Sequence, residues 1–539
     1  MSESTKRSFV QGAAVLGAAG IICKIIGALF RVPLGNILSE SGMAYYQVAY
    51  PIYTTLLMIS SAGIPAAISK MVSERVAVDD YRNAHYVYQV SYRMLLLIGL
   101  CSMTLLMALS YPIAAGIGMA ESYPTLLAIA PSLFFVSVIS AYRGYFQGLQ
   151  MMTPTAISQL IEQIVKLIAG FGLAAAMVGM GELWGAVGAV IGVTLSELVS
   201  MAYLFITYGR RSRDIRRQIR SSPRVKSFET QKEVAKKLLT IAVPITIGAS
   251  IMPLVNLIDT AMVTNVLKAI GYGAEQARSR YGLLTGYVAP IINVPSVLST
   301  ALQVSLVPAI SALMTRRRAD AVRHTAQQGL KLAIIIGLPC AVGLFILAGP
   351  ITAMLYRTLE YDSIVLATTL MQVMSIATFL LIMIQTATGI IQGIGRPRIP
   401  VRNLAIGAGL KVITTFVLMR YTGLNIVGAP IGTCICYATA AGLNIYYLFY
   451  HIGLSVNVGD FLLRPLACTA VMGLSVFGVY MLLSGFIGNS ISTLLSVVIG
   501  VAIYAVMVMV IGAIKPEDAR ILPGGAKLDS LMRNLGLWR

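Results

Sequence analysis

The chain has 539 residues, of which 57% are hydrophobic and 12% charged, and its mean hydropathy is +0.80. This composition excludes a soluble globular protein, because apolar stretches long enough to cross a bilayer as helices recur from end to end. The net charge of +20 does not indicate a nucleic-acid partner, since the basic residues gather in alternate loops, as membrane topology requires.

Fourteen apolar stretches predict an all-α polytopic membrane protein with one transmembrane helix per stretch. Several are longer than a straight crossing needs, which permits tilt or a bend. They lie at residues 9–34, 43–70, 86–112, 123–148, 154–179, 183–208, 236–266, 281–314, 326–350, 363–393, 399–420, 424–450, 460–485 and 489–514.

The N-terminal segment MSESTKRSF is short and basic and precedes the first apolar stretch. No small-residue cleavage site follows it, which predicts an uncleaved first helix and not a removed signal peptide. The six cysteines lie almost all in apolar stretches, without CxxC spacing, and there are three histidines. We therefore expect no disulfide framework, metal site or cofactor, and interpret the cysteines as small packing residues.

The first stretch carries two basic side chains, Lys24 and Arg31. A cation in the hydrocarbon core costs at least a few kcal/mol and normally faces a cavity or a partner. Because the two are close to two helical turns apart, they share roughly one face. Facing a central cavity, they would form an anion site in which Arg31 grips a phosphate bidentately. The alternative is that Arg31, near the end of its stretch, snorkels to the outer interface.

The second stretch is interrupted by Pro51 and Pro65, which a membrane helix tolerates only where neighbours satisfy the freed backbone groups. Its first half is rich in tyrosine. These side chains form an interfacial belt or, alternatively, line the cavity and contact sugar or peptide groups of a substrate. They are Tyr45, Tyr46, Tyr50 and Tyr53.

Further charges lie inside later stretches. Glu162 and Lys166 have the spacing and order of a helical i,i+4 ion pair, and we predict a structural pair. Glu197, in the sixth stretch, has no obvious local partner and is an alternative partner for Lys166. Asp259 and Lys411, in the seventh and eleventh stretches, are predicted to form a salt bridge. The alternative for Asp259 is a sodium or proton site.

Basic residues concentrate in loops that follow even-numbered stretches. The loop 209–237 is the richest and contains RRSRDIRRQIR, whereas the loops 113–122 and 484–490 have no Lys or Arg. By the positive-inside rule, both termini are expected to be cytoplasmic. We interpret the loop 209–237 as a topology determinant and linker, with an anionic-lipid contact as the alternative.

The two halves of the chain share motifs. Gln147-Gly148 recurs as Gln392-Gly393, 245 positions later, and IPAAISKMVSER in the second stretch resembles LVPAISALMTRR in the eighth. Two similar six-helix lobes are the architecture of alternating-access transport. The predicted domains are an N-terminal lobe (1–210), a basic cytoplasmic linker (211–235), a C-terminal lobe (236–452), two additional helices (453–514) and a cytoplasmic tail (515–539).

Three segments carry a family likeness: GMAYYQVAYPIYTTLLMISSAGIPAAISKMVSE, YRGYFQGLQMMTPTAISQLIEQIVK and GLLTGYVAPIINVPSVLSTALQVSLVPAIS. They resemble the polysaccharide-synthase type transporters of the multidrug/oligosaccharidyl-lipid/polysaccharide (MOP) superfamily, and within it the SpoVB/YtgP group, relatives of the MurJ lipid II flippases. The resemblance implies a flippase of the bacterial plasma membrane, and not an enzyme. Its implied substrate is an undecaprenyl-pyrophosphate-linked cell-wall precursor, such as lipid II, moved to the outer leaflet.

The resemblance also implies partners and settings. The partners are the polyprenyl-diphosphate-linked oligosaccharide and membrane lipids, with cell-wall synthesis or division proteins as candidates. Peptidoglycan synthesis, cell shape and sporulation are the implied settings.

In MurJ-like members, basic residues of the first, second and eighth helices face a central cationic cavity. Lys24 and Arg31 match the first-helix positions, whereas the second- and eighth-helix arginines have no match in this sequence. Arg278 and Arg280 lie earlier, near the start of the eighth stretch. The candidate substrate-binding residues, tyrosines included, are Lys24, Arg31, Tyr46, Tyr50, Arg278 and Arg280.

Some relatives bind sodium among the seventh, eleventh and twelfth helices. Asp259 matches one ligand, but Lys411 stands where another would be, so sodium coupling is not expected. Three other functions stay open. A cation-coupled multidrug exporter would need an acidic cavity, an integral-membrane glycan polymerase or ligase usually needs a sizeable extracytoplasmic loop, and a scaffold for wall or spore-coat assembly would not need the intramembrane charges.

Overall fold

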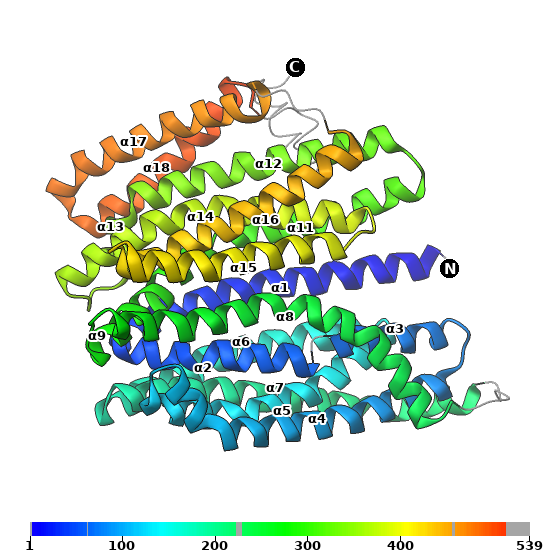
Figure 1. Ribbon diagram of the computed structural model, residues 1–539. Coiled ribbons are helices and arrows are strands. Elements are labelled where there is room, and N and C mark those ends of the chain that lie inside the picture. The colour runs from blue at the N-terminus through cyan, green and yellow to red at the C-terminus, as the bar shows by residue number, and fades with distance from the viewer. Residues whose placement is uncertain (1–2, 62, 223–228, 455–458, 514–539) are drawn as a thin grey trace. The chain divides into compact units, whose positions relative to one another are not determined.

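The computed structural model describes residues 3–61, 63–222, 229–454 and 459–513, which form an all-helical membrane fold (Figure 1). Within these residues, 14 helical segments are long and apolar enough to cross a membrane. The prediction of a polytopic all-α protein with fourteen spans is confirmed. The predicted tail at 515–539 and the linker residues 223–228 lie outside the described residues.

The chain divides by its internal packing into two units, Met1–Gly282 and Leu283–Arg539. Within the first unit, α8, which is the seventh predicted span, packs against α2 and α3. The predicted division into two lobes and a linker stays a prediction. The elements of the first unit are α1 (Glu3–Ile37), α2 (Glu40–Ser61), α3 (Gly63–Val76), α4 (Tyr81–Gly116), η1 (Ala120–Ser122), α5 (Tyr123–Gly148), α6 (Met152–Met177), η2 (Val178–Met180), α7 (Glu182–Ser221), α8 (Gln231–Ala269) and α9 (Ala274–Gly282).

In the second unit, the last two helices, α17 and α18, run side by side and pack on α12 and α13 (Figure 1). The elements of this unit are η3 (Leu283–Val288), α10 (Ala289–Asn293), α11 (Ser296–Thr315), α12 (Ala319–Ile346), α13 (Ala348–Leu355), α14 (Tyr361–Gly393), α15 (Arg398–Tyr421), η4 (Asn425–Val427), α16 (Gly428–Ile452), η5 (Gly459–Leu463), α17 (Arg464–Ile487) and α18 (Asn489–Val510).

The predicted eighth span, 281–314, is not one continuous helix. A π-helical turn, η3, is followed by the short α10 and then by α11. Pro290 and Pro295 lie in this segment, and proline lacks the N–H that an α-helix needs and clashes with the preceding turn. The chain therefore changes helix type and turns before α11 begins.

The second span contains Pro51 inside α2 and Pro65 in the first turn of α3, and α2 continues as a helix through Pro51. The predicted interruption at Pro51 is therefore wrong. Pro51 leaves the Gln47 carbonyl without its helical N–H partner, and the Tyr281 hydroxyl on α9 reaches this oxygen at 3.5 Å. The N–H of Gly63, the first residue of α3, donates to the Thr246 hydroxyl on α8 at 3.2 Å. Neighbouring helices thus bond backbone groups of this span, which is how membrane proteins tolerate proline inside a helix.

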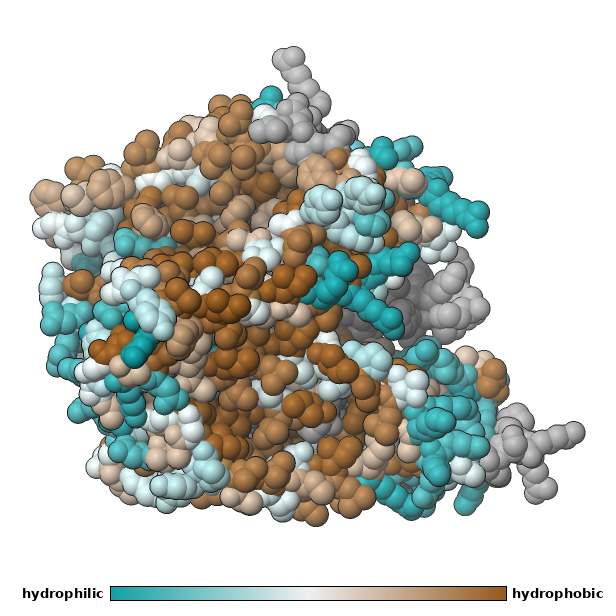
Figure 2. Space-filling view, viewed as in Figure 1, coloured by the Kyte–Doolittle hydropathy of each residue, from teal (hydrophilic) through white to brown (hydrophobic). Residues whose placement is uncertain are grey.

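Apolar side chains both fill the units and cover their surface. The main core of the first unit joins α3, α4, α5, α7 and α8, and that of the second joins α11, α12, α14 and α16. In each unit, hydrophobic side chains cover the middle of the face shown in Figure 2, and hydrophilic ones gather towards the helix ends. Exposed side chains such as Ile168 and Leu474, at 68% and 75% exposure, suit contact with lipid.

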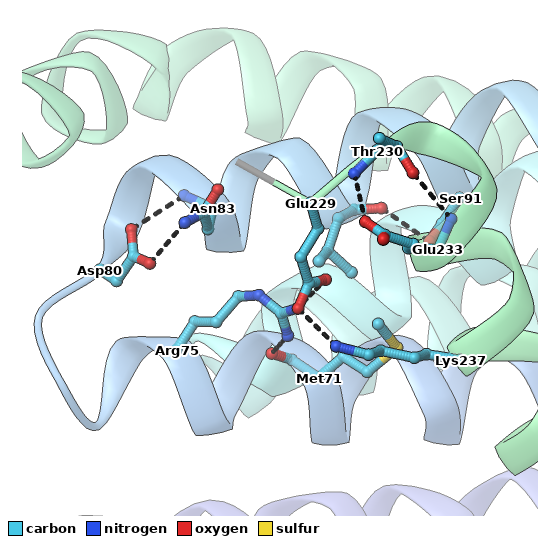
Figure 3. A network of polar contacts seen from close by, with 10 residues as sticks. Met71, Arg75, Asp80, Asn83, Ser91, Glu229, Thr230, Glu233 and Lys237 are labelled. Carbon is cyan, nitrogen blue, oxygen red and sulfur yellow. Dashed lines mark hydrogen bonds and ion pairs between the residues drawn. The ribbon is translucent and has the colours of Figure 1, made fainter. Parts of the chain in front are cut away.

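Glu229 ties α3 to α8 at one end of the first unit (Figure 3). Its carboxylate accepts hydrogen bonds from Arg75 on α3 and Lys237 on α8, each at 2.6 Å. The next residue caps α8, because the Thr230 hydroxyl accepts from the Glu233 N–H while the Glu233 carboxylate accepts from the Thr230 N–H. We call this end of the first unit, where Arg75, Lys236 and Lys237 gather, the basic end. An open pocket of about 830 Å³ lies there between α3, α4 and α8.

Glu229→Gln is expected to lower the free energy of unfolding by about 1 kcal/mol at neutral pH. Partial burial alone would raise the pKa of Glu229, but the Lys237 hydrogen bond and the Arg75 charge outweigh it and hold the pKa below its usual value. Because the native pKa is the lower one, this stabilisation is present above the ordinary glutamate pKa of about 4.3 and is lost as the pH falls through the native pKa. Thermal unfolding of the purified wild-type protein and the Glu229→Gln variant at neutral and acidic pH measures this difference in stability.

Glu74→Gln is the matched control for that experiment. The Lys70 amine lies 3.9 Å from the Glu74 carboxylate, and both side chains are more than half exposed (60% and 59%). Such a pair contributes at most about 0.5 kcal/mol. An equal loss of stability in the two variants would contradict the role of Glu229.

Candidate substrate and charge site

The basic face of α1 meets the tyrosines of α2 at Arg31. The Arg31 guanidinium carbon lies 5.6 Å from the centroid of the Tyr50 ring, which is cation–π distance. Arg31 and Tyr50 are both partly exposed, and Lys24, two turns earlier on α1, is exposed. The ring supports the guanidinium from one side and leaves its planar edge available for hydrogen bonds to an anion.

Aromatic rings form a row along α2. Tyr46 and Tyr50 have centroids 6.1 Å apart, as do Tyr50 and Tyr53, and the Phe30 ring of α1 lies 6.4 Å from that of Tyr46. The spacings of four and three residues place the tyrosines on one helix face. Tyr46 and Tyr53 are 2% and 4% exposed, so the row is packed inside the unit and is not an interfacial belt.

Arg143 on α5 is the partner of Glu162. Its Nη2 lies 3.0 Å from Glu162 Oε2, and its Nε donates to the Ser158 hydroxyl at 2.9 Å. The predicted Glu162–Lys166 pair is therefore wrong: within the described part of the chain, Lys166 lies on the same helix without an ion pair to Glu162. The forked guanidinium reaches across from α5 and binds two groups of α6 through separate N–H donors held in one plane, a fixed geometry that a lysine ammonium lacks.

Glu197 on α7 meets Tyr53 and not Lys166. The Tyr53 hydroxyl donates to Glu197 Oε1 at 3.4 Å, while the other carboxylate oxygen, Oε2, is buried and has no hydrogen-bond partner among the residues that the structure describes. The alternative prediction of a Glu197–Lys166 ion pair is thus wrong as well. A chain of contacts therefore connects Arg31 to a buried acid: Arg31 lies over the Tyr50 ring, Tyr50 contacts Tyr53, and Tyr53 donates to Glu197.

Arg278 and Arg280, on α9, have other partners than the Arg31 site. The Arg278 guanidinium bonds Glu121 at 2.8 Å and lies 4.7 Å from the Tyr45 ring, and the Tyr45 hydroxyl donates to Glu121 at 2.6 Å. Arg280 lies 4.2 Å from the Tyr272 ring. Arg278 and Arg280 thus contact other aromatic rings and acids than Arg31 does. That they bind the substrate remains a prediction.

Asp259 and Lys411 belong to different units. Asp259 lies on α8 of the first unit, and Lys411 lies on α15 of the second and is 6% exposed. Their salt bridge stays a prediction. Among the described residues, no three His, Cys, Asp or Glu side chains lie close enough together to hold a metal ion.

Sequence reasoning overlooked Arg143, although a signal was available. Arg143 stands inside the predicted fourth span, in the motif YRGYFQG. An arginine within a membrane span normally has a buried partner, and the nearby acids on later spans were candidates. Glu121 gave no such signal, because it lies in a loop between spans.

Comparison of the sequence with known proteins shows which family the chain belongs to. The family model described as polysaccharide biosynthesis protein matches residues 9–314, more than half of the chain. The chain belongs to this family. The MatE model also matches, over residues 244–417. A polysaccharide biosynthesis protein of this type is a multi-pass transporter of the MOP superfamily and not an enzyme.

Three curated relatives from Bacillus subtilis (strain 168) resemble this family member over nearly its whole length. Uncharacterized membrane protein YabM is 29% identical, covering 99% of this chain and 98% of YabM. Stage V sporulation protein B is 26% identical, covering 96% and 98%. Lipid II flippase MurJ is 26% identical, covering 96% and 97%.

Two solved structures share the fold. Lipid II flippase MurJ in an inward closed conformation has a TM-score of 0.66 at 16% identity, covering 92% of this chain and 98% of that one. A multidrug resistance MATE family transporter in an inward-facing conformation has a TM-score of 0.63 at 14% identity, covering 80% and 94%. These likenesses establish the fold of this family member and leave its substrate to be inferred.

Proposed function

We propose that this protein is a flippase that moves a polyprenyl-diphosphate-linked cell-wall precursor from the cytoplasmic to the outer leaflet by alternating access. Lipid II is the first candidate substrate. The observation that carries the proposal is the partly exposed Arg31 guanidinium on a membrane-spanning helix, held against the Tyr50 ring. Placing a cation inside the membrane costs free energy unless it faces a cavity or a partner, and an anionic head group is such a partner.

The chemistry of the α1–α2 face suits a lipid-linked diphosphate. Arg31 offers bidentate hydrogen bonds to a phosphate, and the exposed Lys24 adds a second positive charge on the same helix. The Tyr50 ring beside them can pack against a sugar face. The polyprenyl chain would stay in lipid while the charged head group crosses.

Relatives and charge distribution support the same proposal. A full-length relative carries the name Lipid II flippase MurJ. The concentration of Lys and Arg in residues 209–237, at the end of α7 and the start of α8, supports cytoplasmic termini and a basic end that faces the cytoplasm of a bacterial cell. Cell-wall synthesis or division proteins are the proposed partners.

A multidrug exporter is the second candidate, favoured by the structural likeness to a MATE family transporter. Binding of cationic drugs calls for acidic groups at the site. The α1–α2 face presents Lys24 and Arg31 instead, which disfavours cationic ligands by like-charge repulsion.

Arg31→Ala is expected to abolish rescue of a bacterium depleted of its lipid II flippase, while the wild-type protein rescues growth. Arg31→Lys should rescue only in part, because an ammonium lacks the bidentate fork. Growth, with membrane abundance measured by immunoblot, is the readout. The control is Arg213→Ala, which removes an exposed arginine of α7 and should rescue fully.

Full rescue by Arg31→Ala at normal abundance would overturn the role of Arg31. Failure of the wild-type protein to rescue, together with export of a cationic dye from intact cells that persists in Arg31→Ala, would favour the exporter instead.

A further inference from the structure

Glu197 is a carboxyl group that the proposed substrate site does not use. It lies on α7, inside a segment that crosses the membrane, and is 5% exposed. An ionised carboxylate removed from water costs several kcal/mol unless hydrogen bonds or an opposite charge replace its hydration. The contacts of Glu197 therefore decide which protonation state suits this site.

Those contacts are sparse. From the described part of the chain, Oε1 accepts one long hydrogen bond, 3.4 Å from the Tyr53 hydroxyl, and the buried Oε2 accepts none. The titratable and charged groups that face Glu197 come from the helices packed against α7, namely Tyr53 on α2, Arg143 on α5, and Glu162 and Lys166 on α6.

Neither cation neutralises Glu197 directly. Arg143 is committed to Glu162 at 3.0 Å and to Ser158 at 2.9 Å. Within the described residues, Lys166 forms no ion pair with Glu197, although it is itself only 9% exposed. Glu162 adds a second negative charge nearby. A carboxylate has about four lone-pair sites, and here it receives one long hydrogen bond. A neutral acid without a partner for its O–H costs less than a buried charge without one.

We propose that Glu197 is a proton-binding site of the transport cycle. The proton is taken from water onto Oε2, the oxygen without a partner, while Oε1 keeps the Tyr53 hydrogen bond. The site is linked to the substrate face, because Tyr53 lies three residues from Tyr50 on α2 and their rings are in contact.

The link rests on the proposed function. An anion that binds Arg31 changes the contact between Arg31 and Tyr50, and the ring contact passes this change to Tyr53, which donates to Glu197. Coupling between two sites is reciprocal. Proton binding at Glu197 therefore changes the affinity of the Arg31 site for an anionic head group, and anion binding changes proton occupancy.

Infrared spectroscopy of the full-length protein in lipid nanodiscs tests the proton site without a substrate. The wild-type protein should show a protonated-carboxyl C=O band at neutral pH, well above the ordinary glutamate pKa of about 4.3. Glu197→Gln should remove this band, and the matched Glu182→Gln, at an exposed position of the same helix, should retain it. A band that is absent, or that persists in Glu197→Gln, overturns the proposal.

Tyr53→Phe gives a second readout that does not depend on the folding of Glu197→Gln. Loss of the hydroxyl frees Oε1, so the C=O band should remain and move to higher frequency. An unchanged band would show that Tyr53 does not bond a protonated Glu197, and would overturn the assignment.

The link is tested with undecaprenyl diphosphate as the probe. The affinity of the wild-type protein should vary with pH across the neutral range, by at most about tenfold per pH unit for one proton, and that of Glu197→Gln should not. A pH-independent wild-type affinity overturns the link. Absence of any probe binding overturns the proposed function, while the infrared result still decides the proton site.

Discussion

Arg143→Met is expected to lower the free energy of unfolding by about 3 kcal/mol. The substitution keeps an apolar stem on α5 but leaves the Glu162 carboxylate uncompensated. The side chains of the pair are only 16% and 19% exposed, and the guanidinium also bonds Ser158. Removing one partner of such a pair leaves the other charge unpaired in a region of low dielectric, and this unpaired charge accounts for most of the loss. Equilibrium unfolding of the purified protein in lipid–detergent micelles measures the loss.

Two further variants give that experiment its controls. The double variant Arg143→Met with Glu162→Gln should recover most of the loss, because no unpaired charge remains. Lys166→Met should cost clearly less than Arg143→Met, since Lys166 does not hold Glu162. A cost for Lys166→Met equal to that for Arg143→Met would contradict the observed pairing and restore the i,i+4 pair.

Gly192→Ala is expected to destabilise the protein by about 1–3 kcal/mol, because α6 and α7 cross there with their backbones in contact. A Cβ on Gly192 would overlap backbone atoms of Gly170 and Ala169. No flexible side chain is available to move aside, so the two helices would have to separate. Thermal unfolding of the purified variant is the measurement.

Gly172→Ala is the matched control for Gly192→Ala. Gly172 lies on α6, two residues from Gly170, and a Cβ there meets nothing within 4 Å. Alanine should stabilise this helix by about 0.5–1 kcal/mol, since glycine loses more backbone entropy on folding. The two variants should therefore change stability with opposite signs. A shared sign would show that general helix propensity, and not the crossing, dominates at Gly192.

The fourteen spans could be predicted because each is a local property of the sequence. About 20 consecutive apolar residues suffice to cross the hydrocarbon core, whatever the neighbouring helices do. The repeat was equally readable, and its glycines occupy matching positions. A Cβ on Gly148 would meet Val72 of α3 at 2.6 Å, and one on Gly393 would meet Ile310 of α11 at 2.9 Å.

The break in the eighth span marks the limit of a hydropathy argument. Residues 281–314 are predominantly apolar, but Pro290 and Pro295 each lack the N–H that continues the hydrogen bonds of an α-helix. Hydropathy reports whether a segment lies in the membrane, and backbone hydrogen bonding decides whether it is one helix.

Local spacing misled the assignment of ion pairs. Glu162 and Lys166 stand four residues apart, which allows contact on an isolated helix. Arg143 lies on another helix, α5, and its guanidinium bonds both Glu162 and Ser158. An i,i+4 pair contributes only about 0.5 kcal/mol, so a well-placed partner across a buried helix interface outweighs it.

The sequence by itself determined the class of this protein, the number of its spans, and the presence of Lys24 and Arg31 on one face of a membrane helix. These follow from composition and from the 3.6-residue helical period. Only the tertiary structure decided that Arg31 lies against the Tyr50 ring and that Arg143 pairs with Glu162. It also decided that, among the described side chains, Tyr53 is the one that donates to Glu197. Those contacts depend on how each helix is rotated and how closely it approaches its neighbours, which no single span specifies.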